Sequence, residues 1–306
     1  MAAYLARRGL RMAVILLLAS VAVFYSLRFA PGDPSGVVLS PLALEQVRAA
    51  YRERLGLNQP VAVQYGVYVS NLARGNLGTS LVTGTSIGEL LRTYGRNSLV
   101  LGLTAFALSY LIGLPLGVLA AARRNSLIDQ AATAIGIVGM GMPNFWLALL
   151  LIYLFSAKLH WLPSAGCCGP SHLIMPAMVL AAEGTAVTMR MMRASMLEQL
   201  GQDFVRTHRA KGLAEWVVVG GRAFRNALIP IVSLSGLRLG WLIGYALIVE
   251  TIFAWPGVGY LLVDAVLRRD YPVAQFFSLL LVFVVVVANL LADVAYGLVD
   301  PRIRYA

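Results

Sequence analysis

Two long stretches of this chain contain no charged residue, and they limit its fold more than any other feature. Residues 99–122 and 130–157 carry no Asp, Glu, Lys or Arg. A helix needs roughly 20 apolar residues to cross the hydrocarbon core of a bilayer, and each stretch exceeds that length. With 59% hydrophobic and only 13% charged residues in the whole chain, the composition predicts an integral membrane protein rather than a water-soluble domain.

Four further apolar stretches bring the expected number of transmembrane helices to about six. They are residues 12–30, 173–189, 227–249 and 272–292. The first follows three arginines and imitates a secretory signal, but no small-residue cleavage site comes after it, so we expect an uncleaved helix. The predicted fold class is therefore an all-α membrane protein.

The distribution of basic residues predicts that both termini lie in the cytoplasm. Lys and Arg concentrate at the N-terminus, at the turn around Arg123, in residues 190–225 and in the tail with Arg302 and Arg304. Cytoplasmic loops of membrane proteins carry such an excess. The net charge of +11 is explained by this topology. The sequence contains no basic run interleaved with aromatic residues outside the spans, so it does not predict a nucleic-acid partner.

Glycines with a four-residue spacing predict close contacts between helices. Gly113 and Gly117 have this spacing, and Gly236, Gly240 and Gly244 repeat it twice. Small residues at this spacing let two membrane helices approach closely. The pattern leaves open whether the neighbouring helix belongs to the same chain or to a second subunit.

Enzymatic motifs are missing from the sequence. A Walker A motif needs a lysine preceded by glycine, and neither Lys158 nor Lys211 has one. The three histidines form no H-E-x-x-H, and no nucleophile elbow or dinucleotide fingerprint is present. We therefore expect no catalytic residue and no bound cofactor, and an intramembrane hydrolase is the least favoured alternative.

A short basic segment in the expected cytoplasmic region between the fourth and fifth spans carries the most information. Asp203 suits a helix N-cap and Gly212 a C-terminal cap, which predicts about two turns of helix between them. Phe204, His208 and Lys211 fall on one face of that helix. By its physical character alone, the helix could lie against anionic lipid headgroups or against a protein partner.

This segment resembles a known family. Residues 203–212, followed by 225–230, resemble the cytoplasmic signature loop of binding-protein-dependent ABC importer permeases, in the subgroup that serves dipeptides, oligopeptides and nickel. Further stretches agree with the same subgroup in the same order: residues 31–34, 56–60, 64–65, 75–78, 142–146, 161–163, 250–259, 269–272 and 300–305. The resemblance thus covers nearly the whole chain.

The resemblance implies the type I permease fold and a division of the chain. Residues 1–95 would form the first transmembrane helix and an extracytoplasmic region, and residues 96–299 the transmembrane domain with a coupling loop at 198–226. Residues 300–306 would form a cytoplasmic tail. The implied location is the bacterial plasma (inner) membrane, as a multi-pass protein.

The resemblance also implies partners. A second permease would complete the path, two ATPase subunits would use ATP and Mg²⁺, and an extracytoplasmic binding protein would deliver substrate. The ATPase-docking residues would be Asp203, Phe204, Arg206, Thr207, His208, Arg209, Ala210, Lys211 and Gly212. Phe204 would be the buried anchor in an ATPase groove. His208 departs from the subgroup, which usually has a small residue there.

Charged residues inside spans are costly and are often functional. Glu183 and Arg238 are therefore candidates for the translocation path or for a mutual ion pair, although Glu183 could also reach water at a boundary. Asn144 and Ser233 complete the candidate path residues. Pro115, Pro143 and Pro230 can kink their helices and absorb motion during alternating access, or they can form static kinks whose freed backbone groups neighbouring helices satisfy.

The expected solute is a short peptide, and nickel or a metal chelate is the alternative within the family. His160, Cys167, Cys168 and His172 are weak candidates for a metal site, because imidazole and thiolate suit borderline metals. No metal site is assigned on that basis. An ATP-independent secondary transporter is the rival outside the family, but the chain shows no inverted repeat.

Overall fold

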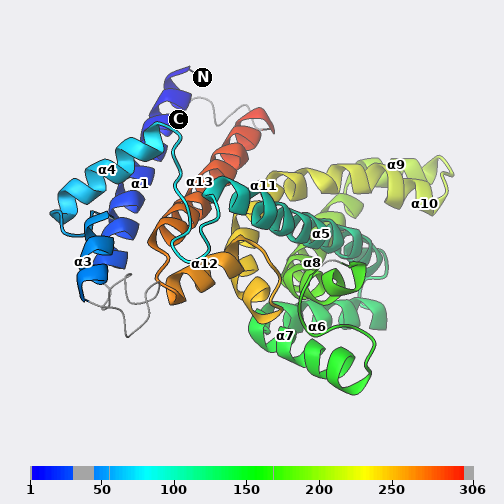
Figure 1. Ribbon diagram of the computed structural model, residues 1–306. Coiled ribbons are helices and arrows are strands. Elements are labelled where there is room, and N and C mark those ends of the chain that lie inside the picture. The colour runs from blue at the N-terminus through cyan, green and yellow to red at the C-terminus, as the bar shows by residue number, and fades with distance from the viewer. Residues whose placement is uncertain (1, 30–44, 55, 168, 300–306) are drawn as a thin grey trace. The chain divides into compact units, whose positions relative to one another are not determined.

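The computed structural model describes residues 2–29, 45–54, 56–167 and 169–299 (Figure 1). These residues are helical apart from connecting turns and one isolated bridge between Thr79 and Ser86. The chain divides into two compact units, Met1–Ser98 with Pro256–Val286 and Leu99–Trp255 with Val287–Ala306. Each unit is built around its own apolar core.

The first unit holds the N-terminal helices and the start of the C-terminal one. Its elements are α1 (Ala2–Phe29), α3 (Glu45–Arg54), α4 (Val61–Ala73), the beginning of α5 (Ile87–Ala122), α12 (Val258–Leu267) and the beginning of α13 (Tyr271–Val299).

The second unit holds the central helices. Its elements are the rest of α5, α6 (Leu127–Gly141), α7 (Asn144–Leu151), the π-helix η1 (Ile152–Lys158), α8 (Pro170–Leu200), α9 (Asp203–Ala210), α10 (Glu215–Val217), the π-helix η2 (Val218–Ala223) and α11 (Phe224–Ile252).

By length and composition, four helices in the described part of the chain can cross a membrane. They are Arg7–Phe29, Ile87–Ala122, Pro170–Leu200 and Tyr271–Leu290. A fifth crossing results if the bent pair Leu127–Gly141 and Asn144–Lys158 counts as one span. The expected stretch at residues 227–249 lies inside α11, whose 29 residues extend over about 43 Å. The all-helical membrane fold is confirmed.

The third expected span, residues 130–157, is not one continuous helix. It breaks between α6 and α7, which are bent by 106°. Met142 is extended, with φ −87° and ψ 119°, and Pro143 follows it. Proline disfavours helical backbone in the residue before it and cannot donate a hydrogen bond, so the helix ends at Gly141 and restarts at Asn144. Pro143 thus breaks the helix, whereas the sequence predicted only a kink.

The core of the first unit joins helices that are far apart in sequence. Its buried apolar residues are Ile87, Val258, Leu261, Ala265, Val273, Ala274 and Phe277. Beside them Asp270 is only 4% exposed. Its carboxylate accepts hydrogen bonds from the Ser80 hydroxyl at 2.5 Å and from the backbone N–H of Leu81 at 3.1 Å. A buried carboxylate requires such donors, so this pair fixes the turn before α5 to the corner between α12 and α13.

Glycines decide how closely α5 packs against α8 in the second unit. A Cβ atom on Gly117 would stand 2.6 Å from the carbonyl oxygen of Met189, and one on Gly113 would stand 2.9 Å from that of Thr185. The partner of this glycine pair is therefore a helix of the same chain. Gly244 on α11 has open space within 4 Å.

Candidate docking helix and the polar contacts around it

The short helix α9 begins and ends close to where the sequence predicts. Asp203 is its first residue rather than its N-cap, because Gln202 precedes it with extended backbone and makes no side-chain cap bond. A carboxylate in the first turn still interacts favourably with the helix dipole. Gly212, with φ +74°, lies just after the last turn and reverses the chain, as expected.

Val205 holds α9 to the rest of the chain. Its side chain is fully buried, and α9 contacts the π-helix η2 that leads into α11. The buried residue of α9 is thus Val205, whereas Phe204 is only partly buried. The Phe204 ring meets the His208 ring edge-on, with centroids 6.1 Å apart. His208 therefore supports the aromatic flank of the helix.

The remaining surface of α9 is charged and exposed. Arg209 reaches across the turn to Glu215, with Nε 3.1 Å from Oε2 and Nη2 2.5 Å from Oε1. This hydrogen-bonded pair lowers the pKa of Glu215 and raises the pKa of Arg209. Arg206 lies 3.6 Å from Asp203. Exposed pairs of this kind add little stability, so they chiefly orient the side chains.

Two apolar side chains beyond α9 were not singled out in the sequence. Trp216 in α10 is 79% exposed and Leu213 is 39% exposed. Tryptophan is enriched at protein interfaces, so an exposed tryptophan in a short helix is a candidate contact. The only signal in the sequence is an aromatic residue directly after Glu215, and one aromatic residue by itself does not identify a contact surface.

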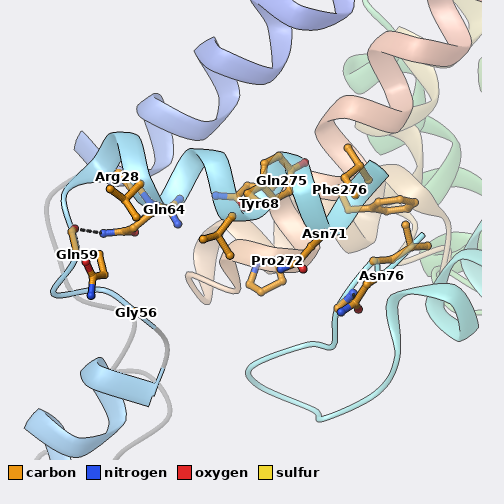
Figure 2. Close-up of a pocket in the computed structure, with 15 residues that line it drawn as sticks. Arg28, Gly56, Gln59, Gln64, Tyr68, Asn71, Asn76, Pro272, Gln275 and Phe276 are labelled. Atoms are coloured by element: carbon orange, nitrogen blue, oxygen red, sulfur yellow. Dashed lines mark hydrogen bonds between the residues drawn. The ribbon is translucent and has the colours of Figure 1, made fainter. Parts of the chain in front are cut away.

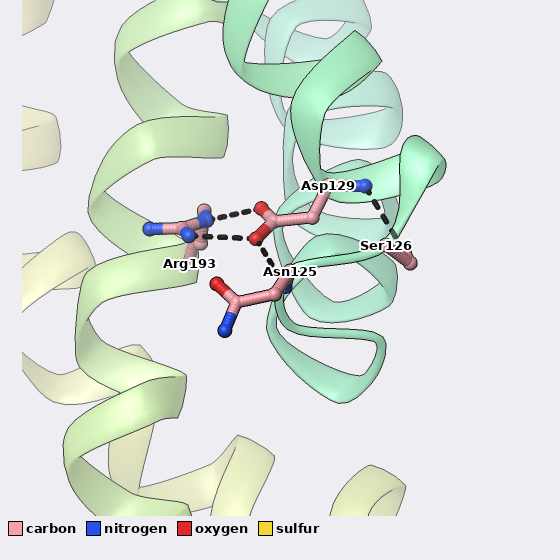
Figure 3. Close-up of polar contacts among 4 residues, drawn as sticks. All are labelled: Asn125, Ser126, Asp129 and Arg193. Atoms are coloured by element: carbon pink, nitrogen blue, oxygen red, sulfur yellow. Dashed lines mark hydrogen bonds and ion pairs between the residues drawn. The ribbon is translucent and has the colours of Figure 1, made fainter.

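An ion pair joins the first turn of α6 to α8 (Figure 3). Nε of Arg193 lies 2.5 Å from Oδ1 of Asp129, and Nη2 lies 2.8 Å from Oδ2. The backbone N–H of Asn125 also donates to Oδ2, at 3.0 Å. The sequence analysis missed this pair, although Ser126 followed three residues later by an acid is a capping signature, and Ser126 is indeed the N-cap of α6.

The described contacts leave the prediction of the candidate path residues untested. Glu183 in α8 and Arg238 in α11 are both partly buried, and they share no ion pair among the described contacts. One guanidinium nitrogen of Arg238 nevertheless comes within 3.8 Å of the position that a Cβ on Gly184 would take. Asn144 is partly buried at the start of α7, and the Ser233 side chain lies outside the described part.

The weak metal candidates do not form a cluster in the described part of the chain. No group of three or more His, Cys, Asp or Glu side chains there is placed to hold a metal ion. Cys167 is disulfide-bonded, and the other cysteine of the chain, Cys168, lies outside the described residues. Nδ1 of His172 is buried without a hydrogen-bond partner.

Comparison with known proteins identifies the class of this chain. A model described as "Binding-protein-dependent transport system inner membrane component" matches residues 113–305, and the corresponding N-terminal model matches residues 1–88. The oligopeptide transport system permease AppB of Bacillus subtilis is 40% identical over the full length of both chains. The glutathione transport system permease GsiC of Escherichia coli is 39% identical over 99% of both.

Solved structures agree on the fold. A chain of the MetNI methionine ABC transporter in an inward-facing conformation superposes with a TM-score of 0.58 at 21% identity. The match covers 69% of this chain and 96% of the other. At this identity the likeness supports the fold alone, which is that of a type I importer permease.

Helices long enough to cross a bilayer, together with the matching family models, define this chain as a multi-pass transport permease. The chain belongs to the family of binding-protein-dependent transport system inner membrane components. It is therefore a permease subunit of an ABC importer in the bacterial plasma membrane, and the resemblance found in its sequence is confirmed.

Proposed function

We propose that this permease imports short peptides. The observation that carries the proposal is the full-length similarity to permeases named for oligopeptide and glutathione transport, because glutathione is itself a tripeptide. The same relatives favour peptides over nickel or a metal chelate. Peptides would arrive from an extracytoplasmic binding protein, and a second, similar permease would complete the path.

The energy would come from separate ATPase subunits that bind ATP and Mg²⁺, with no cofactor held by this chain. This chain would contact the ATPases through α9. The Phe204 side of α9 and its charged side chains do not belong to the core of this chain. Residues 203, 204, 206–212 would dock there, and the exposed Trp216 extends that surface. A helix in a groove is a recurrent mode of protein recognition, in which one buried aromatic residue supplies much of the affinity.

Motion would pass from α9 to the membrane helices through two firm contacts. Helix α9 contacts η2, and η2 continues directly into α11. The other end of α9 follows α8 after a two-residue turn. ATPase closure would therefore act on α8 and α11 together and would shift the population between two arrangements of the path.

The path itself would include Glu183, Arg238, Asn144 and Ser233. Glu183 and Arg238 are charged residues on α8 and α11, the two helices that flank α9, η2 and α10 in sequence. The proposed organisation keeps residues 1–95 as the first helix with the extracytoplasmic region, 96–299 as the transmembrane domain with its coupling loop at 198–226, and 300–306 as a cytoplasmic tail.

Uptake by the reconstituted complex tests this function. Proteoliposomes holding both permeases and the ATPases receive the cognate binding protein with a labelled panel of dipeptides and tripeptides, and separately nickel with and without a chelator. We expect ATP-dependent accumulation of peptides only. Accumulation of nickel alone would show that the substrate is a metal rather than a peptide. Uptake that persists without ATP would favour a secondary transporter.

A further inference from the structure

The first unit contains a cavity of about 270 Å³ that the transport mechanism above does not use (Figure 2). It is formed by the end of α1, by α4 and by the start of α13. Figure 2 shows Arg28 and Gln64 at one end and Asn71 and Asn76 at the other, with Tyr68 and Gln275 between them.

Three polar atoms around this cavity are buried and have no hydrogen-bond partner among the described residues. They are Nη1 of Arg28, the hydroxyl oxygen of Tyr68 and Nε2 of Gln275, and all three side chains line the cavity. Gln275 is only 4% exposed. All three groups can donate a hydrogen bond, and a buried donor without an acceptor is costly. The arrangement therefore favours an acceptor that the described residues do not supply.

Arg28 is held in position by contacts that leave one side of its guanidinium unpaired. Its Nε donates to Oε1 of Gln64 at 2.8 Å, and Gln64 in turn donates to the carbonyl oxygen of Gln59 at 2.8 Å. The guanidinium carbon lies 3.6 Å from the centroid of the Phe24 ring. Arg28 is a cation, and none of the described residues that line the cavity is an Asp or Glu, so an anion would satisfy the free side of its guanidinium.

A second, apolar cavity of about 470 Å³ adjoins the first. The two share Tyr68, Leu72 and Phe276. The rest of the second cavity is lined mainly by aliphatic and aromatic side chains of α1, α4 and α13, among them Leu16, Leu17 and Phe283. A polar anion site therefore continues directly into an apolar one.

The depths of the two cavities along the spans match the two parts of a lipid. Arg28 is the second-last residue of the span Arg7–Phe29, and Gln275 lies in the second turn of the span Tyr271–Leu290. Leu17 and Phe283 each lie twelve residues from those same ends, which is roughly 18 Å into the hydrocarbon region. Counted along the two spans, the donors thus lie near the span ends and the apolar cavity near the span middles.

We propose that these joined cavities bind one anionic phospholipid, with its phosphate at Arg28, Tyr68 and Gln275 and one acyl chain along α1 and α13. A peptide carboxylate would satisfy the same donors, but the apolar cavity at mid-span depth favours a lipid. The absence of a carboxylate among the described lining residues leaves no partner for an ammonium headgroup. The inference rests only on the membrane location of the chain and not on its transported substrate.

Native mass spectrometry of the full-length chain, purified with its partner subunits in mild detergent, tests the proposal with phosphatidylglycerol as the probe. We expect one retained lipid per chain and at least a tenfold loss of retention in Arg28→Gln and in Gln275→Leu. Arg74→Gln is the matched control, because Arg74 is an exposed arginine of the same unit that does not line the cavity, and it should retain the lipid. Equal retention by all three variants would overturn the site.

Competition separates the sources of the anion. Lysophosphatidylglycerol should displace the bound lipid, whereas glycerol 3-phosphate at the same concentration should not, because it lacks the acyl chain. Displacement by glycerol 3-phosphate or by a tripeptide would overturn the lipid assignment. Equal retention of phosphatidylethanolamine would overturn the preference for an anionic headgroup.

A variant away from the donors keeps the test valid if Arg28→Gln folds poorly. Leu17 lines the apolar cavity and is 57% exposed, so Leu17→Trp fills space without disturbing a packed core. We expect this variant to lose lipid at least fivefold while its elution volume and thermal midpoint stay those of the parent. Full retention by Leu17→Trp would exclude the apolar cavity as the acyl-chain site.

Discussion

Asp129 and Arg193 form a two-pronged ion pair between the start of α6 and the late part of α8. The carboxylate also accepts the backbone N–H of Asn125, so one side chain fixes both the α5–α6 turn and the helix that leads into α9. Basic residues around both segments place this pair on the expected cytoplasmic side. It is suited to keep α8 rigid when a partner pushes on α9.

Asp129→Asn should therefore weaken transport several-fold and lower the thermal midpoint of the permease. The amide cannot form a charged pair with Arg193, and the guanidinium then lacks its partner. Thermal unfolding in detergent and peptide uptake measure the two effects. Asp264→Asn is the control: it breaks the exposed Arg268–Asp264 pair, which should be worth less than about 1 kcal/mol. Indistinguishable midpoints for the two variants would contradict the role of Asp129.

Phe204 and Val205 are neighbours in α9 with different expected roles. Phe204→Ala should abolish coupling between ATP hydrolysis and uptake without changing stability, because its ring is not part of the chain's own core.

Val205→Ala should instead destabilise the loop by about 2 kcal/mol, since it removes buried methyl groups. Gly212→Asp should also uncouple transport, because residues with a side chain rarely adopt φ +74° and the added carboxylate changes the charge of the turn after α9.

The docking measurements are co-purification of the ATPase and ATP-driven uptake, with membrane insertion as the control for expression. Unchanged uptake by both Phe204→Ala and Gly212→Asp would refute α9 as the docking helix. Loss of ATPase binding in Trp216→Ala as well would extend the contact to α10.

The contact between α5 and α8 depends on the missing side chain of Gly117. Gly117→Ala should lower stability by roughly 1–3 kcal/mol, because the new methyl group would overlap the Met189 carbonyl and force the helices apart. Gly244→Ala is the matched control, since space around Gly244 is open in this chain. The thermal midpoints of the two variants test this prediction. A midpoint for Gly117→Ala equal to or higher than that of Gly244→Ala would show that α5 and α8 adjust to the added methyl group.

Ser80 and Asp270 should be as important to the first unit as the glycines are to the second. Ser80→Ala removes the hydroxyl donor and leaves a buried carboxylate oxygen without its partner, which costs about 1–3 kcal/mol. Ser70→Ala, at an exposed position of α4, should change nothing measurable. Proteolysis of the turn between α4 and α5 reports the loosening directly, and equal cleavage of the two variants would contradict the assignment.

Much of this protein follows from local features of its sequence. Uninterrupted apolar stretches predict the helices, because a bilayer supplies no hydrogen bonds and forces the backbone to satisfy its own. The approximate position of α9 follows from the segment between Asp203 and Gly212, and the reversal of the chain after α9 follows from the positive φ of Gly212. Membership of the family follows from motifs spread along the chain.

Other features were decided only by the tertiary structure. Asp129 meets Arg193 across 64 residues, Ser80 meets Asp270 across 190, and the donors at Arg28, Tyr68 and Gln275 come from three separate helices. A local sequence pattern does not indicate which distant residue a polar side chain contacts. The glycines on α5 predicted close packing but not their partner, because spacing defines a face of one helix, whereas the partner depends on how the whole chain folds.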